Sequence, residues 1–462
     1  MNNRKSFKKP NAKQRDVESK PSVLGFWSRG KILLAILVVL VAIFIGNGGF
    51  VGFFDSMATN ALARNQLAPA ERWLNWASHF SSTNARAEFL RARLARKQGQ
   101  LDRMAEFLQV AYKLGYDKTQ LQHEQDLGLA SMGRLEGGTE ERLIQWLAES
   151  PAEADEIIDA YANGLTALSR FDDAVRLLVE WEQASPSNPI ANYRRARIHE
   201  YFHLPEEAEK EYQKAIGKDP TFSKASYHLA RVLLQRRHPE EALEYFRACE
   251  KGAPALAAKT GIAGCYRSLG EPEKARKTLL EVMESSYDAI QNSYRSVDES
   301  QERFVAASEL GCIETELGEF AEARKHLELA LDKFPLDSIA RYSYAVTLRG
   351  LGLTDEAEEN FERTRKARAA LDQVSELQEV LRKQPNDTEA RMRIGKIILE
   401  HEAEHAGVFW IQSIFAYDPD NAEAHQTLAE YYEAKPNPST DDKKLAQYHR
   451  SFLNKQKADG KD

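Results

Sequence analysis

Cysteine, glycine and proline are scarce in this chain of 462 residues, which contains 3 Cys, 25 Gly and 16 Pro. Cys249, Cys265 and Cys312 have no metal-type spacing and cannot all pair with one another, so we interpret them as small core residues. The abundant residues are Ala, Leu, Glu, Arg and Lys, which lose little rotamer freedom in a helix. The composition therefore favours an all-α protein.

The sequence signatures of common enzyme sites are also missing. The chain has no glycine-rich phosphate loop, no G-x-S-x-G nucleophile elbow and no Cys and His in a setting that suits nucleophilic catalysis. We therefore expect neither an enzymatic activity nor a cofactor.

A net positive charge is found at the N-terminal end of the chain, and the rest is acidic. Residues 1–31 carry nine Lys or Arg and two acidic residues, whereas residues 55–462 have a net charge of -14, and the whole chain sums to -7. We predict that residues 1–31 form a basic, disordered cytoplasmic tail. A body this acidic argues against a nucleic-acid partner, because phosphate contacts need a basic face.

The chain has one long apolar run, residues 32–54, which carries no charge. As a helix it measures about 34 Å, enough to cross a hydrocarbon layer of about 30 Å, and predicts a transmembrane signal-anchor helix held in a lipid bilayer. A cleavable signal peptide ending at Ala61-Leu62-Ala63 is the alternative. The basic residues before the run predict a single-pass bacterial inner-membrane protein with a cytoplasmic N-terminus and its bulk on the periplasmic side.

Residues 193–208 and 227–242 repeat one another at an offset of 34 without a gap. Both segments begin with tyrosine, carry alanine at Ala196 or Ala230, and end with Pro-Glu-Glu-Ala. Self-similarity at such a period is typical of stacked helical or propeller repeats. Because the composition favours helices, the period predicts an α-solenoid, a superhelix of helix-turn-helix units that each contact their neighbours.

The unit that ends at Pro254 resembles the tetratricopeptide repeat, a helix-turn-helix family of about 34 residues. The positions that carry the resemblance are Leu229, Ala230, Leu233, Ala242, Phe246, Cys249 and Pro254. The resemblance implies that the first helix of each unit lines an inner groove, and that the protein binds other proteins.

The small residue that opens the second helix of each unit recurs along the chain. It is found at Ala70, Met104, Ala174, Ala208, Ala242, Ala275, Ala323, Ala357 and Gly407. Five of the successive gaps are 33 or 34 residues, and the longer gaps leave room for one degenerate unit at 127–151 and for insertions near 284–301 and 366–383. We predict about ten units over residues 55–434, followed by a linker and a C-terminal capping helix in 435–462.

Tyrosine and arginine recur at non-core positions of the first helices, where they are expected to line the groove. Tyr193 and Arg197 lie four residues apart, as do Tyr227 and Arg231, so each pair shares a helix face. The full candidate set is Tyr193, Arg197, Tyr227, Arg231, Arg267, Tyr342 and Arg349. Such a ladder suits an extended acidic peptide or a C-terminal carboxylate, because Arg binds carboxylates bidentately. The alternative is a solvated face whose arginines pair with glutamates of the next unit.

Residues 401–405 spell His-Glu-Ala-Glu-His, which on one continuous helix places two zinc ligands beside a general base. The repeat register instead puts His401 at the end of one helix and His405 at the start of the next. We therefore predict a polar turn between helices and no metal site, with His401 and His405 kept as the metal-ligand candidates.

These observations predict a membrane-anchored scaffold or adaptor that collects partner proteins, with the two insertions as irregular places where a dedicated partner docks. Two alternatives stay open. The first is a zinc-dependent hydrolase that uses His401 and His405. The second is a receptor with its repeats in the cytosol, similar to the tetratricopeptide import or chaperone receptors.

Overall fold

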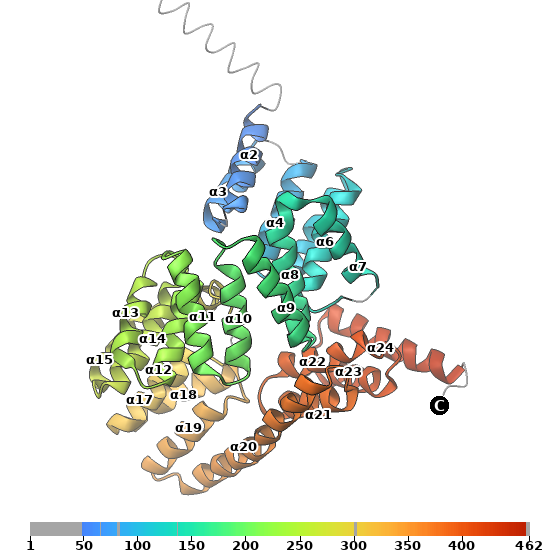
Figure 1. The fold of residues 1–462 in the computed structure, drawn as a ribbon. Helices are drawn as coiled ribbons and strands as arrows, with labels where there is room; N and C mark the ends of the chain where they lie inside the picture. The colour runs from blue at the N-terminus through green and yellow to red at the C-terminus, as the bar shows by residue number, and fades with distance from the viewer. Residues whose placement is uncertain (1–48, 65, 81–83, 136, 300–302, 459–462) are drawn as a thin grey trace, which may run out of the picture.

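The computed structural model describes residues 49–64, 66–80, 84–135, 137–299 and 303–458, and these contain helices and turns but no strand (Figure 1). The helices that precede the first insertion are α2 (Gly49–Ala63), α3 (Leu67–Ser78), α4 (Ala85–Lys97), α5 (Leu101–Lys113), α6 (Lys118–Ser131), α7 (Thr139–Glu149), η1 (Pro151–Glu153), α8 (Ala154–Ala167), α9 (Phe171–Ala184), α10 (Ile190–Tyr201), α11 (Pro205–Lys218), α12 (Ser223–Gln235), α13 (Pro239–Ala248), α14 (Ala255–Ser268) and α15 (Pro272–Met283). The remaining helices are α16 (Tyr287–Arg295), α17 (Val305–Leu317), α18 (Phe320–Lys333), α19 (Ser338–Gly350), α20 (Thr354–Lys383), α21 (Thr388–His401), α22 (Glu404–Gln412), η2 (Ser413–Ala416), α23 (Ala422–Ala434) and α24 (Thr440–Ala458). The predicted all-α solenoid is confirmed for the described residues.

Consecutive helices pack as pairs, and each pair packs on the next. The alanines at the helix crossings, among them Ala196, Ala208, Ala230 and Ala242, are fully buried, because helix axes about 8–10 Å apart leave room only for small side chains. Proline begins α11, α13 and α15, where its missing N–H costs nothing and its fixed φ suits a first turn. The three cysteines are buried and free, as predicted.

The first insertion forms α16 and the turn that follows it. Ile290 and Val297 are fully buried and Tyr294 is 4% exposed, so the insertion is part of the hydrophobic core of the central repeats. The backbone N–H of Ala257, at the start of α14, donates to Ser293 Oγ over 3.0 Å. These contacts hold α16 against α14 and bring the turn at 296–299 onto the first helices of the preceding units.

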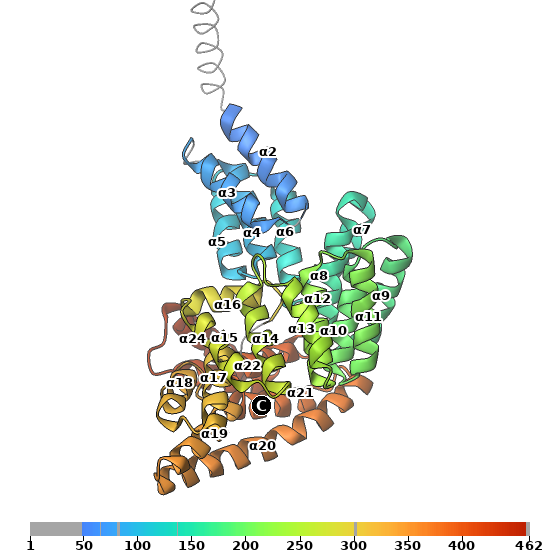
Figure 2. The same cartoon turned by 90° about the vertical axis from the view of Figure 1, so that its left-hand side faces the viewer.

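The second predicted insertion, residues 366–383, is the second half of α20, a helix of 30 residues. In Figure 2 this helix runs along one edge of the molecule and carries the chain from α19 to α21. Leu377, Leu381 and Ile394 pack together where α20 meets α21. The extra turns therefore move the last four helices away from the axis of the central repeats.

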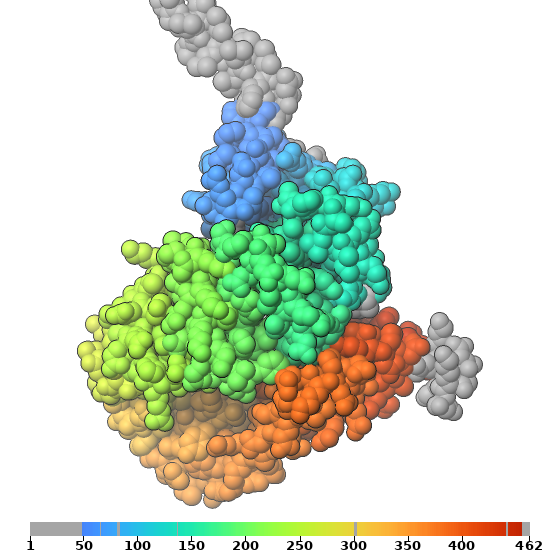
Figure 3. Space-filling view, in the orientation of Figure 1, coloured from blue at the N-terminus to red at the C-terminus, as the bar shows by residue number. Residues whose placement is uncertain are grey.

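The last helices return to the middle of the array. The guanidinium of Arg391, on α21, is fully buried and donates to the carbonyl oxygen of Leu168, at the end of α8. The Tyr417 hydroxyl donates to the same carbonyl over 2.9 Å. Figure 3 shows the surface of this C-terminal part (orange to red) continuous with that of α8 and α9 (green). The solenoid is therefore bent so far that residues more than 200 positions apart are in contact.

The prediction of a single-pass membrane protein is wrong for the described residues, because none of their helices is long and apolar enough to cross a bilayer. Residues 49–54, the end of the predicted span, belong to α2, a 15-residue helix that continues to Ala63 and packs against α3 and α4. Asp55 lies within this helix, 3% exposed, and accepts a hydrogen bond from Asn84. The predicted tail (1–31) and residues 32–48 of the predicted span lie outside the described residues.

Candidate functional site

The concave side of the array has a hollow of about 610 Å³ between α8, α10 and α12. Its lining residues are Asn163, Thr166, Arg194, Arg197, Glu200, Tyr201, His203, Leu204, Pro205, Arg231, Val232, Gln235, Asp298 and Glu299. Three of them are arginines, although residues 55–462 carry a net charge of -14. The same lining includes three carboxylates, Glu200, Asp298 and Glu299, so the hollow balances its charges locally, and its volume is in the range of ligand pockets.

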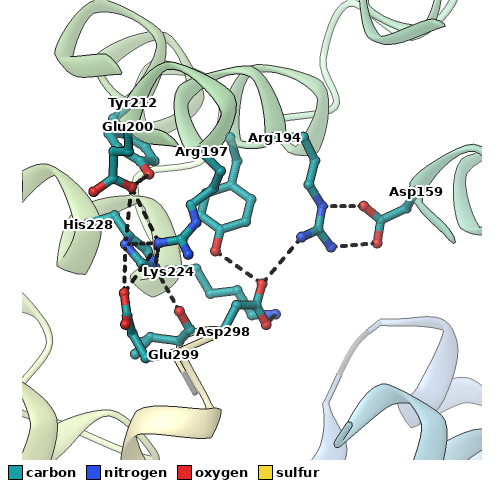
Figure 4. A network of polar contacts seen from close by, with 11 residues as sticks. Asp159, Arg194, Arg197, Glu200, Tyr212, Lys224, His228, Asp298 and Glu299 are labelled. Carbon is teal, nitrogen blue, oxygen red and sulfur yellow. Dashed lines mark hydrogen bonds and ion pairs between the residues drawn. The ribbon is translucent and has the colours of Figure 1, made fainter. Parts of the chain in front are cut away.

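Asp298 is the centre of the first half of a polar network in this hollow (Figure 4). Lys224 Nζ donates to its Oδ1 over 2.7 Å, and the Tyr193 hydroxyl donates to its Oδ2 over 3.0 Å. Arg194 holds Asp159 of α8 with two parallel hydrogen bonds of 2.7 and 3.1 Å, and its remaining nitrogen lies 3.7 Å from Asp298. One carboxylate of the first insertion thus joins side chains from two first helices, α10 and α12.

Glu299 is the centre of the second half. Its carboxylate accepts from Arg231 and lies 3.3 Å from the guanidinium of Arg197. Arg197 also donates to His228 Nδ1 over 2.7 Å and lies 3.3 Å from Glu200. His228 Nε2 in turn lies 2.7 Å from the backbone carbonyl of Val297. Two successive carboxylates and one carbonyl of the insertion are therefore held by side chains of the array.

The charge states follow from these contacts. Burial alone would raise the pKa of Asp298, but the Lys224 ammonium and the Arg194 guanidinium hold it at about 2. Burial lowers the pKa of His228 well below its ordinary value, and Arg197 and Arg231 lower it further. His228 is therefore neutral, and its contacts assign the proton to Nε2, which donates to Val297 while Nδ1 accepts from Arg197.

The structure places two of the predicted groove residues in the core. Tyr193 is 1% exposed and Tyr227 is 4% exposed. The ring of Tyr227 lies edge-on against Tyr294 of α16, and Tyr193 is bonded to Asp298. The prediction that these rings are open to a ligand is corrected, because the first insertion covers the positions that a regular array leaves open.

The predicted arginines have three different surroundings. Arg197 and Arg231 lie in the hollow, side-chain exposed by 32% and 41%, and contact Glu299. Arg267 pairs with Glu309 and Glu316 of α17, which is the pairing with the next unit that the alternative interpretation expects. Their contact with a partner stays a prediction.

Tyr342 and Arg349 do not line the hollow. Both lie on α19 and contact Phe361, Tyr342 with its ring edge-on at 5.7 Å and Arg349 with its guanidinium 5.1 Å from the ring centroid. They form a separate and more exposed pair, and their contact with a partner also stays a prediction.

The H-E-x-x-H segment does not form one helix. α21 ends at His401, Ala403 has extended backbone, and α22 begins at Glu404. The predicted turn is confirmed, and it places the two histidines on different helices. Within the ranges that the structure describes, no three side chains of His, Cys, Asp or Glu are grouped as metal ligands.

Sequence reasoning did not find the acidic half of the site. Asp298 and Glu299 lie in the insertion that the repeat spacing marks near 284–301, but nothing in the repeat pattern says where an insertion folds. Arg194, Lys224 and His228 were also missed, and their signal is their place on first helices one turn from the predicted tyrosines and arginines. Asp159, on α8, was missed as well and has no predicted residue on its helix.

A sequence model of the tetratricopeptide repeat matches residues 162–223, 227–289 and 309–372. These segments contain α9 to α11, α13 to α15, α18 and α19 in full, and parts of α8, α12, α16, α17 and α20. No curated protein sequence matches the chain significantly.

Several solved structures share the helical-repeat arrangement at low sequence identity. A structure from a study of Pseudomonas aeruginosa PilF is 14% identical, with a TM-score of 0.39 over 46% of this chain and 92% of that one. YrrB, described as a TPR protein with an unusual peptide-binding site, is 18% identical, with a TM-score of 0.29 over 40% and 90%. A human IFIT1 dimer with PPP-AAAA is 15% identical, with a TM-score of 0.40 over 87% and 95%. At these scores the likeness does not extend to partners.

Proposed function

We propose that the protein is a non-enzymatic scaffold that binds a segment of a partner protein in the hollow between α8, α10 and α12. The middle of the chain matches the tetratricopeptide repeat, and proteins with this repeat serve as scaffolds for protein–protein interaction. The observation that carries the proposal is the hollow itself, with Arg197 and Arg231 on its lining and partly open to solvent.

Charge favours an acidic partner segment. Four cations reach this site from α10 and α12, namely Arg194, Arg197, Arg231 and Lys224. Among the described residues of the repeats, Asp159 and Glu200 pair with them. Guanidinium groups bind carboxylates in a fork geometry that gives both affinity and register. The acidic body of the protein repels such a segment elsewhere, so the hollow is where it binds most favourably.

Two groups of described histidines that could suggest catalysis are not arranged for it. His401 and His405 are separated by a helix break. His228, which is fully buried behind the hollow, has both ring nitrogens engaged, and burial keeps its pKa low, so it is a poor general base at neutral pH.

Selection of peptides from a random library on the full chain tests the proposal. We expect the enriched peptides to contain adjacent Asp or Glu residues. Their affinity should fall about tenfold or more in Arg231→Gln, which removes a charge-assisted hydrogen bond worth about 1.5–3 kcal/mol.

Arg247→Gln is the matched control, because Arg247 is an exposed arginine on α13 that does not line the hollow. Enrichment of peptides without acidic residues would contradict the proposal. Equal loss of affinity in the two variants would contradict it as well, since the effect would then be one of net charge.

A further inference from the structure

The turn after α16 occupies the hollow in the way that a bound acidic peptide does. Val297 presents its carbonyl oxygen to His228, Asp298 presents a carboxylate to Lys224 and Tyr193, and Glu299 presents one to Arg231. Figure 4 shows the side chains of Asp298 and Glu299 pointing from the insertion toward residues of α10 and α12. Three successive residues are thus recognised by side chains of the array.

The charges match as a ligand and its site match. Without the insertion, four cations of the array face two carboxylates, a surplus of two positive charges in a partly buried hollow. Asp298 and Glu299 supply the two negative charges that balance this surplus. The cations come from two separate repeats, and the carboxylates that neutralise them come from the insertion. This division between a cationic surface and a separate acidic segment is what a binding site and its ligand have.

The tip of the insertion is held less firmly than its base. Ile290 and Val297 are fully buried, whereas the side chains of Asp298 and Glu299 are 30% and 21% exposed. Asp298 also has a φ of 58°, in the left-handed region that favours glycine and that Asp tolerates better than most other residues. Polar contacts at a partly exposed surface can be exchanged for equivalent contacts with another molecule, but the buried apolar base cannot.

We propose that the carboxylates of Asp298 and Glu299 are an internal ligand that engages the cations of the partner site and is displaced by an acidic peptide segment, while the buried Val297 stays in the core. This inference rests on the proposed function and adds to it that these cations are engaged until a partner competes. It also defines the partner chemistry, which is two adjacent carboxylates.

Competition between the tethered segment and a free peptide gives the expected size of the effect. A tethered segment has an effective concentration on the order of millimolar, so if its own affinity is about micromolar, it lowers the apparent affinity of a free peptide by far more than tenfold. Neutralising the tethered carboxylates should remove most of this penalty and leave the array side chains unchanged.

The test uses the full chain and a fluorescent peptide with the sequence of residues 293–299, Ser-Tyr-Arg-Ser-Val-Asp-Glu, with blocked ends. Asp298→Asn with Glu299→Gln is the test variant. Glu284→Gln with Asp288→Asn is the control, because it removes the same charge from exposed residues of the same insertion, outside the hollow. We expect the test variant to bind the peptide at least about tenfold more tightly than the wild type or the control does.

Three results distinguish a failure of the internal-ligand proposal from a failure of the proposed function. Equal affinity of wild type and test variant for the acidic peptide overturns the internal ligand and leaves the proposed function standing. If neither chain prefers the acidic peptide over its Asn-Gln counterpart, the proposed function fails as well. If the test variant binds the acidic peptide more tightly than the wild type and the control variant do, both proposals are supported.

Hydrogen exchange of the wild-type chain tests displacement without any substitution, so a folding defect in the variant cannot explain its result. Saturating acidic peptide should speed exchange of the amides of residues 298 and 299 while α10 and α12 become more protected. Unchanged exchange at 298 and 299 with the peptide bound overturns displacement, since the peptide would then bind beside the turn.

Discussion

The two insertions that interrupt the array have similar lengths and opposite effects on the fold. Residues 284–301 include the short helix α16, which is folded inward with Ile290 and Val297 fully buried. Residues 366–383 continue a helix outward, and most of their ion pairs, such as Glu379 with Arg382, are solvent-exposed. One insertion packs against α14 inside the array, and the other lengthens a helix that runs along the edge of the molecule (Figure 2).

The difference shows how a repeat array acquires features that its repeats do not encode. An insertion with apolar residues at a buried face becomes part of the core and can deliver polar groups to a groove. An uninterrupted amphipathic helix acts as a spacer, because at 1.5 Å per residue the extra 18 residues displace the later helices by about 27 Å. Here the displacement brings Arg391 to Leu168.

The largest effect is expected from Ile290→Ala, which breaks the inward insertion. Removing a fully buried isoleucine should lower the free energy of unfolding by about 3 kcal/mol through lost transfer energy and the cavity left behind. Chemical denaturation measures the loss, and faster hydrogen exchange in α16 should accompany it. Asn292→Ala, an exposed change on the same helix, should leave both unchanged; if it does not, α16 is sensitive for reasons other than its buried face.

A smaller effect is expected from Arg391→Ala, which breaks the contact that the outward insertion makes possible. The change deprives the carbonyl of Pro385 and Ser413 Oγ of a donor inside the protein and should cost about 2 kcal/mol. Exchange should accelerate at the end of α8 and in α21, which share this contact. Arg393→Ala is the control, since Arg393 is exposed two residues away. Equal loss in the two variants would mean that the contact adds no stability.

The smallest effect is expected from Glu379→Gln, which removes an exposed ion pair of the outward insertion. Pairing with Arg382 lowers the pKa of Glu379 to about 2, but both side chains are more than 40% exposed and water screens the interaction. The thermal midpoint should stay within experimental error. Asp298→Asn, measured beside it, should lower the midpoint clearly, because that carboxylate joins side chains of two first helices. A larger drop in the thermal midpoint for Glu379→Gln than for Asp298→Asn would contradict the distinction between an outer spacer and an inner ligand.

Repeat spacing predicted much of the fold. Alanine at 196, 208, 230 and 242 was expected to be buried at helix crossings, and all four are. Helical periodicity and small-residue spacing are local properties, so they survive in a single sequence. The site was predicted less well. Arg197 and Arg231 do line the hollow, but Tyr193, which was expected to be open to a ligand, lies under the insertion.

By itself, the sequence determined that this protein is a stack of helix pairs, where its insertions lie, and that the helix between His401 and His405 is broken. These depend on period, on small residues and on chain register, which neighbouring residues set. Only the tertiary structure decided that Asp298 and Glu299 meet Lys224 and Arg231, about 70 residues away, and that Arg391 meets Leu168. Those contacts depend on the accumulated rotation of many units and on which face each insertion buries, and neither can be read from any one repeat.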